Sequence, residues 1–294
     1  MTPAALLSPE RAQVAFDGFR TSPRLDHPEG LDIDPVDGSL WCGGEAGQLY
    51  RIDLDAGTIE LRDLNEGGFT LGVRFAPDRR VYWLDALHRQ LRCMAVDKGE
   101  VEVVVDRATG DTPILYPNAL DLSPDGTLYF TDSRALADDG PSYGVFRVEP
   151  SGRSSLWCAG PFDFANGIAL SPDGSAVYVA ESASSSVARV AVRADGSAGA
   201  VDRVCDLGGP VPDGLMFGPD GLLYITCYYP SVILRLEQDG AVSTVIEDPI
   251  GHTLANPTNL VFSGTDAYVA NLGRWHITRI DMAELLTPHV TDRR

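Results

Sequence analysis

The sequence predicts an all-β fold, a six-bladed β-propeller of four-stranded antiparallel blades. Segments such as "FANGIALSPDG" recur along the chain, each with an apolar alternation followed in most copies by a turn rich in Pro, Asp or Gly. Their leading residues are Glu29, Leu71, Asn118, Asn166, Asp213 and Asn259. The repeat of about 47 residues is typical of a propeller or solenoid. Within each copy the apolar residues alternate with period two, which indicates strands.

The fifth copy shows a complete unit. It reads "GLMF", "LLYITCY", "SVILRLE" and "AVSTVIE", with Asp-Gly turns after the first and third segments. This pattern predicts four short antiparallel strands. Six such units in a closed ring leave few exposed sheet edges. The Trp-Asp and Gly-His signatures of the commonest propeller class are absent, so that class is excluded.

The sixth copy lacks a fourth strand of its own. After "HITRIDM", residues 283–294 show no strand pattern, whereas residues 13–16 lie ahead of the first complete unit. We therefore expect residues 13–16 to form the outer strand of the last blade and close the ring. Residues 1–294 are expected to form one propeller domain.

Composition narrows the functional classes. The net charge of −19 and the pI near 4.5 argue against binding nucleic acid or an anionic membrane. The five cysteines form no CxxC pair, which favours a reducing compartment. Neither a signal peptide nor an apolar run long enough for a membrane span is evident. We expect a soluble, cytoplasmic protein, a monomer or small homo-oligomer, acting on a small molecule.

The six leading residues directly precede the innermost strands, which line the channel of a propeller. They are therefore expected to form a ring at one mouth of the channel. Five of the six can offer an oxygen atom, and Glu29 and Asp213 are acidic. A single such residue would more often be a turn cap, but five facing one axis favour a site. Two close carboxylates repel unless a cation or proton lies between them. This donor chemistry favours Ca²⁺, with Mg²⁺, Mn²⁺, Zn²⁺ or Fe²⁺ as alternatives.

Strand direction predicts what else lies at this mouth. The loops after the second strands overhang it, and the longest, residues 133–144, is a candidate rim or lid. The segments leading into the first strands bring His27, Phe69, Tyr116, Phe162, Phe164 and His252 close. Asp132 and Glu181 end second strands of adjacent blades. Either they support the ligand amides or a water molecule, or they are solvated charges of the rim.

Several motifs in combination resemble the regucalcin/gluconolactonase family, the senescence marker protein-like lactonases. They are "PEGLDIDP", "ANGIALSPDGSAVYVAES", "PDGLMFGPDGLLYITCY", "NPTNLVF" and "YVANLGRWHITRID". The resemblance covers the chain from about residue 25. The sequence is also similar to bacterial drug-responsive lactonases and, more distantly, to strictosidine-synthase-like propellers.

The resemblance implies one divalent cation in the channel, bound by Glu29, Asn166 and Asp213. It also implies that Asn118 lies near metal and substrate, and that Asp213 is the general base of lactone hydrolysis. One position departs from the family. Sugar-lactone members carry Arg two residues before the third-blade Asn, where this chain has Tyr116. That change favours a less hydroxylated or more aromatic lactone.

The predicted function is therefore a metal-dependent hydrolase that opens a lactone ring. The predicted substrate-binding residues are Asn118, Tyr116, Phe162, Glu181 and His252. No GxSxG, HExxH or Gly-rich phosphate loop offers another chemistry, and His27 and His252 are secondary acid/base candidates. Two alternatives stay open. One is another metal-assisted reaction on this site, such as ester hydrolysis, cyclisation or isomerisation, and the other is a non-enzymatic ligand-binding propeller.

Overall fold

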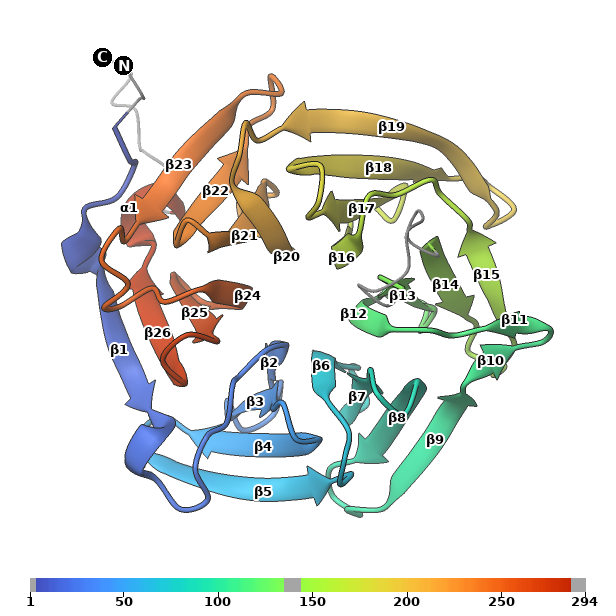
Figure 1. Cartoon of the computed structure of the whole chain (residues 1–294), viewed down its shortest axis with the longest axis horizontal. Helices are drawn as coiled ribbons and strands as arrows, with labels where there is room; N and C mark the ends of the chain where they lie inside the picture. Colours follow the sequence, from blue (N-terminus) through green and yellow to red (C-terminus); the bar gives the residue numbers. More distant parts are fainter. Residues whose placement is uncertain (1–3, 135–143, 287–294) are drawn as a thin grey trace.

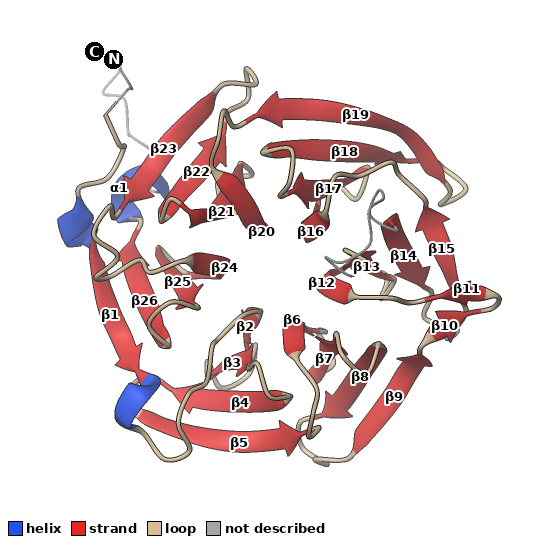
Figure 2. Ribbon diagram, viewed as in Figure 1, coloured by secondary structure: helices blue, strands red, loops and turns tan. Residues whose placement is uncertain are grey.

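Six antiparallel sheets of four strands surround a central channel, as the sequence predicts (Figure 1). The computed structural model describes residues 4–134 and 144–286. Figure 2 shows that strands form nearly all of the regular structure. The described helices are η1 (Pro9–Arg11), η2 (Gly18–Arg20) and α1 (Ala283–Leu286). In the described ranges, no helix has the length and apolar character needed to cross a bilayer.

Each of the first five blades uses four consecutive strands, from the channel outward. Blade 1 contains β2 (Leu31–Ile33), β3 (Leu40–Gly43), β4 (Gln48–Asp53) and β5 (Thr58–Leu64). Blade 2 contains β6 (Thr70–Phe75), β7 (Arg80–Asp85), β8 (Gln90–Ala95) and β9 (Val101–Asp106). A small hairpin follows it, formed by β10 (Ala108–Thr109) and β11 (Thr112–Pro113). Blade 3 contains β12 (Pro117–Leu122), β13 (Leu128–Asp132), β14 (Gly144–Val148) and β15 (Ser154–Cys158).

The remaining blades complete the ring. Blade 4 contains β16 (Ala165–Leu170), β17 (Ala176–Glu181), β18 (Ser186–Val192) and β19 (Ala198–Asp206). Blade 5 contains β20 (Val211–Phe217), β21 (Leu223–Tyr229), β22 (Val232–Leu236) and β23 (Val242–Glu247). Blade 6 contains β24 (Pro257–Ser263), β25 (Asp266–Asn271), β26 (His276–Asp281) and, as its outer strand, β1 (Ala12–Asp17).

The two ends of the propeller are joined by β1 and β26. They pair antiparallel, from Ala12 opposite Ile280 to Asp17 opposite His276. In Figure 1, β1 lies on the outer side of blade 6, as residues 13–16 were predicted to do. Phe16 is 5% exposed and packs in a core cluster with Ile277 and residues of blade 1. The closing strand therefore contributes both ladder hydrogen bonds and apolar contacts.

The core lies between neighbouring blades, where side chains from one face of each sheet meet those of the next. Each apolar cluster combines residues of two adjacent blades, for example β13 and β14 with β7 and β8. All five cysteines are buried and free. They behave as small hydrophobic side chains in this core.

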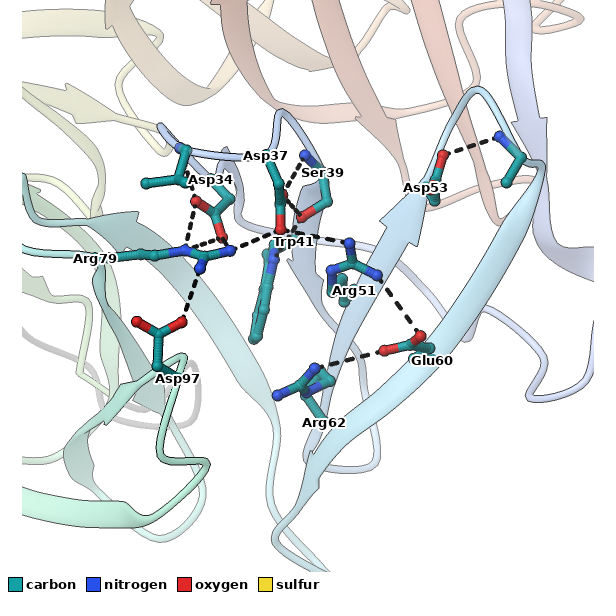
Figure 3. A network of polar contacts seen from close by, with 12 residues as sticks. Asp34, Asp37, Ser39, Trp41, Arg51, Asp53, Glu60, Arg62, Arg79 and Asp97 are labelled. Carbon is teal, nitrogen blue, oxygen red and sulfur yellow. Dashed lines mark hydrogen bonds and ion pairs between the residues drawn. The ribbon is translucent and has the colours of Figure 1, made fainter.

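A charged network joins blades 1 and 2 at the end of the channel away from the ring residues (Figure 3). Arg79 donates to both carboxylate oxygens of Asp34, at 3.0 and 2.9 Å. Its other nitrogens donate to Asp37 at 2.7 Å and to Asp97 at 2.8 Å. Asp34 is 1% exposed, so Arg79 neutralises a buried charge. The network belongs to the scaffold at the turn end of the blades.

Closure of the ring by β1 is expected to be essential for folding. Deleting residues 1–20 should abolish the cooperative unfolding transition measured by calorimetry, because blade 6 would lose its outer strand. Phe16→Ala should lower the free energy of unfolding by about 3–5 kcal/mol, as for other buried Phe side chains. Val14→Ala on the same strand is a matched control with a small effect, because Val14 is 41% exposed. A truncated protein as stable as the full chain would contradict this role.

Candidate functional site

Strand pairing defines which residues share the ring position at the channel mouth. In blades 3, 4 and 5, the residue directly after the last pair before the register shift near the start of the inner strand is Asn118, Asn166 and Asp213, respectively. In blade 6 the first pair is Pro257 with Asn271, so this position is Thr258. The alignment on the turn, which placed Asn259 there, is wrong by one residue. Asn259 occupies the position of Gly214.

A β-bulge re-aims the side chain at this position. In the inner strands of blades 2 to 6, the pairing register shifts at the ring residue, for example between Pro117 and Leu120 and between Pro212 and Leu215. A bulge leaves residues unpaired in the ladder and turns them toward a new direction. The same irregularity in five blades explains why side chains from distant parts of the chain meet at one mouth.

Glycines next to the ring residues let the inner strands approach closely. A Cβ on Gly167 would lie 2.1 Å from the carbonyl oxygen of Asp213, and one on Gly30 would lie 2.2 Å from that of Leu71. No side chain fits at such distances. In blade 3 the same position is Ala119, so the requirement is local to particular blade interfaces. Between blades 4 and 5, the close approach at Gly167 allows Asn166 and Asp213 to meet.

Two carboxyl groups and an amide come together in this ring. Burial, and then the neighbouring Asp213 carboxylate, raise the pKa of Glu29 well above its usual value, and a hydrogen bond from Thr258 opposes the shift. Burial raises the pKa of Asp213 to about 7, although a hydrogen bond from the Asn166 side chain favours the ionised form. Asp213 is thus a neighbour of both Glu29 and Asn166, and its charge disfavours that of Glu29.

The two ring asparagines are held by the same kind of hydrogen bond, from the side-chain amide to a serine. Asn118 Nδ2 donates to Ser133 Oγ at 2.9 Å, and Asn166 Nδ2 donates to Ser182 Oγ at 3.1 Å. Each serine in turn donates to a backbone carbonyl of the next inner strand, in β16 or β20. The amide groups are therefore anchored through their nitrogen atoms to the neighbouring blade.

A cavity of about 1050 Å³ opens over the Glu29 side of the ring. Its lining includes Glu29, Phe69 and Tyr228 around the channel. The remaining walls come from the segment after β1 and from the loop between β25 and β26. Of the predicted residues, His27 and His252 also line it. Asn118, Asn166 and Asp213 do not line this cavity, although Asp213 acts electrostatically on Glu29.

Non-glycine residues with positive φ gather at the same mouth. His27 (41°), Phe164 (60°) and Asn256 (53°) each lie two residues before a ring residue, and Trp275 (55°) lies in the cavity wall. Such conformations are unfavourable for L-residues and concentrate at functional sites. Backbone strain therefore marks the mouth of the channel where the ring residues lie.

The residues at the ends of the second strands are structural. Asp132 accepts hydrogen bonds from the backbone N–H groups of Leu115 and Tyr116, and Glu181 accepts one from that of Asp163. Asp85 and Asn271 hold the corresponding segments of blades 2 and 6. These four side chains are buried. Asp132 and Glu181 are therefore not solvated charges of the rim, because they are buried and their oxygen atoms fix the segments that lead into the inner strands.

Two predicted substrate-binding residues are buried in the structure. Glu181 is 6% exposed and accepts hydrogen bonds from Asp163 and Ser186. Phe162 is 2% exposed and packs in the core cluster between blades 3 and 4. An aromatic side chain next to a channel gains more from burial in the core than from contact with water. Neither side chain reaches the cavity.

Tyr116 lies closer to the ring. Burial raises the pKa of its phenol, with further contributions from the charges of Glu29 and Glu45. His252 is exposed at the rim of the cavity. His27 pairs with Asp26 at 2.9 Å and with Glu45 at 2.8 Å. The proposed lid falls largely on residues 135–143, which lie outside the described residues.

Sequence reasoning missed several contributors to the site. Thr258 could have been found from the preceding proline, since Pro28, Pro117, Pro212 and Pro257 each directly precede a ring residue. Glu45 follows the second strand of blade 1 and could have been found by extending the repeat alignment. Phe19 and Arg20 had no sequence signal, because they reach the cavity only through closure of the ring.

The residues of the ring fit a hard divalent cation. Within residues 4–134 and 144–286, no three His, Cys, Asp or Glu side chains gather as a metal site. The candidate donors are instead the two carboxyl groups of Glu29 and Asp213 and the amide of Asn166. A cation would relieve the repulsion between the two half-buried carboxylates, and oxygen donors suit Ca²⁺ or Mg²⁺.

Substitution of the glycine at the interface of blades 4 and 5 should disturb this arrangement. Gly167→Ala is expected to destabilise the protein by about 1–3 kcal/mol in chemical denaturation, the usual cost of overpacking. It should also alter the site, because β16 and β20 must move apart. Ala119→Gly is the matched control, since it removes a methyl group at the same position of blade 3. Unchanged stability in Gly167→Ala would show that this close approach is not required.

Comparisons with known proteins agree with the fold and motifs. A family model described as the SMP-30/Gluconolactonase/LRE-like region matches residues 27–271. A gluconolactonase of Zymomonas mobilis subsp. mobilis is 33% identical over 119 residues, which cover 38% of this chain and 33% of that protein. The chain therefore spans about a third of the length of this curated relative.

Solved structures show the same architecture. A gluconolactonase from Xanthomonas campestris has a TM-score of 0.75 at 20% identity, covering 92% of this chain and 89% of that one. Regucalcin from Agrobacterium tumefaciens, described as a calcium-binding protein, has a TM-score of 0.71 at 18% identity, covering 87% and 90%. At these identities the likeness is one of fold. Since the family model matches most of the chain, this protein belongs to the SMP-30/gluconolactonase/LRE-like family.

Proposed function

We propose that this protein is a metal-dependent hydrolase that opens the ring of a small lactone. The observation that carries the proposal is the pairing of two half-buried carboxyl groups, Glu29 and Asp213, with the Asn166 amide at the mouth of the channel. The names of relatives add support, since they include gluconolactonases and a calcium-binding regucalcin. Ca²⁺ is the first candidate for the cation.

Glu29, Asn166 and Asp213 would hold the cation. When bound, a divalent cation supplies Lewis-acid polarisation of the lactone carbonyl and lowers the pKa of water. Asp213 accepts a proton from the attacking water, because its carboxylate lies at the ring with Asn166 as a hydrogen-bond partner. Asn118, anchored through Ser133, orients the substrate. The cavity over Glu29 receives the remainder of the substrate.

Cation binding is expected to stabilise the folded protein independently of any reaction. Adding Ca²⁺ at about 100 times its dissociation constant should raise the free energy of unfolding by about 2.7 kcal/mol, read as an increase in Tm. Glu29→Gln should abolish this increase, because one charged ligand is lost. Glu102→Gln on the exposed edge of β9 is the matched control and should keep it. The same Tm increase in both variants would contradict the assigned ligand.

A panel of lactones and open-chain esters, assayed with and without chelator, tests the reaction. We expect lactone turnover that chelator removes and added cation restores. Asp213→Asn should lower kcat/KM by about 100-fold or more, the usual contribution of a general base, while the fold is retained. Asp202→Asn on the exposed face of β19 is the control. An Asp213→Asn enzyme with unimpaired turnover would exclude the assigned base. Cation binding without turnover of any ester would favour a ligand-binding propeller.

A further inference from the structure

One wall of the cavity combines exposed aromatic rings with cationic side chains. Trp275 stands at its centre, with the ring of His27 at 4.4 Å and that of Phe19 at 5.6 Å. The guanidinium of Arg24 lies 4.4 Å from the centre of the Trp275 ring. Phe19 is 57% exposed although it lies within a cavity wall. We call Phe19, Arg20, Arg24, Arg274 and Trp275 the Trp275 wall.

The wall is held in place by backbone hydrogen bonds at the ring closure. Gly18 N–H donates to the carbonyl oxygen of Trp275 at 3.2 Å, and Trp275 N–H donates to that of Asn271 at 3.1 Å. The Phe19 backbone N–H donates to Asp17 at 3.1 Å. The segment after β1 and the loop after β25 are therefore joined, and their side chains form one preorganised surface.

The arginines of this wall have no carboxylate partner. Among the described residues, no carboxylate oxygen lies within the 4.0 Å ion-pair distance of Arg20, Arg24 or Arg274. Arg79 and Arg279, in contrast, are paired with aspartates. Arg20 and Arg274 line the cavity, and Arg24 lies over the Trp275 ring beside it. Their guanidinium groups are therefore available to an anionic ligand.

The acidic side chains of the cavity do not neutralise these arginines. Asp17 accepts the hydrogen bond from the Phe19 backbone, and Glu45 pairs with His27 at 2.8 Å. Glu29 belongs to the ring at the floor of the cavity. None of the acidic side chains thus forms an ion pair with the three arginines, although Asp17 and Glu45 share the cavity lining with Arg20 and Arg274.

We propose that the Trp275 wall binds a carboxylate attached to an aromatic or apolar group, at the end of the substrate remote from the lactone. Arginine matches the planar geometry of a carboxylate, and Trp275 and Phe19 offer faces for an aromatic ring. Only the part of this inference that concerns the lactone end of the substrate rests on the proposed function. It defines the substrate class as an anionic aryl or alkyl lactone. The cavity of about 1050 Å³ is larger than a simple lactone needs.

Binding of phenylacetate and of its neutral isostere phenylacetamide tests the wall directly. Isothermal titration calorimetry in EDTA prevents a cation in the ring from binding the carboxylate. We expect phenylacetate to bind about tenfold more tightly than phenylacetamide, as for a charge-assisted hydrogen bond. The difference should shrink at high salt, because exposed charges are screened.

Two variants separate the parts of the wall. In the Arg20→Gln/Arg274→Gln double variant, phenylacetate should bind no better than phenylacetamide. Trp275→Leu should weaken both compounds. Arg203→Gln, on the exposed outer strand β19, is the control and should leave both affinities unchanged. Tm values equal to that of the unmodified protein would show that the variants are folded.

Equal affinities for the two compounds, no binding of phenylacetate, or an unchanged preference in the double variant would each overturn the proposal. The measurement requires neither turnover nor a metal ion. A protein that binds phenylacetate through this wall but hydrolyses no lactone would therefore refute the proposed reaction and retain the anion site. A protein that hydrolyses a lactone but does not bind phenylacetate through this wall would refute only the anion site.

Discussion

The antiparallel pairing of β1 with β26 is the interaction on which the rest of the structure depends. A propeller holds its inner strands around a common axis only if the last blade is joined to the first. Here the join is made by a segment at the start of the chain, with Phe16 buried against blades 6 and 1. The segment that follows β1 then forms part of the cavity wall, through the hydrogen bond between Gly18 and Trp275. The strand pairing that closes the ring therefore also shapes the candidate site.

The same constraint brings the ring residues together. The inner strands of blades 2 to 6 each contribute a ring residue at a bulge, and the close approach permitted by Gly167 allows blades 4 and 5 to place Asn166 and Asp213 within reach of each other. The outcome is a half-buried pair of acids whose pKa values are raised, chiefly by loss of contact with water and, for Glu29, also by the charge of Asp213. Maintaining such a pair costs stability unless a cation or a proton compensates it. An unfavourable arrangement retained within an otherwise well-packed fold is typical of a functional site.

Charge is distributed unevenly over this mouth. The ring at the floor of the cavity is acidic, whereas the wall made by the closing segment carries arginines next to Trp275. A cation at the floor and an anion at the wall are electrostatically compatible with each other and with a substrate that spans both. Such an arrangement favours the orientation in which the substrate carboxylate lies at the arginines and the lactone carbonyl lies at the ring.

The sequence by itself determined the blades, their strands and most of the ring. The repeat of about 47 residues and the alternation of period two are local patterns, and they led to the six-bladed fold, to the closing strand near residues 13–16 and to Glu29, Asn166 and Asp213. Tertiary structure decided the rest. The bulge moved the sixth ring position from Asn259 to Thr258, because register depends on a partner strand. Phe162 is buried in the core, and Glu181 accepts a hydrogen bond from the backbone of the segment that leads into the inner strand. Phe19 and Arg20 entered the cavity wall only because ring closure carries the start of the chain to blade 6. Local periodicity indicates which residues form strands. It does not indicate the contacts between residues far apart in the sequence, because those arise only when the ring closes.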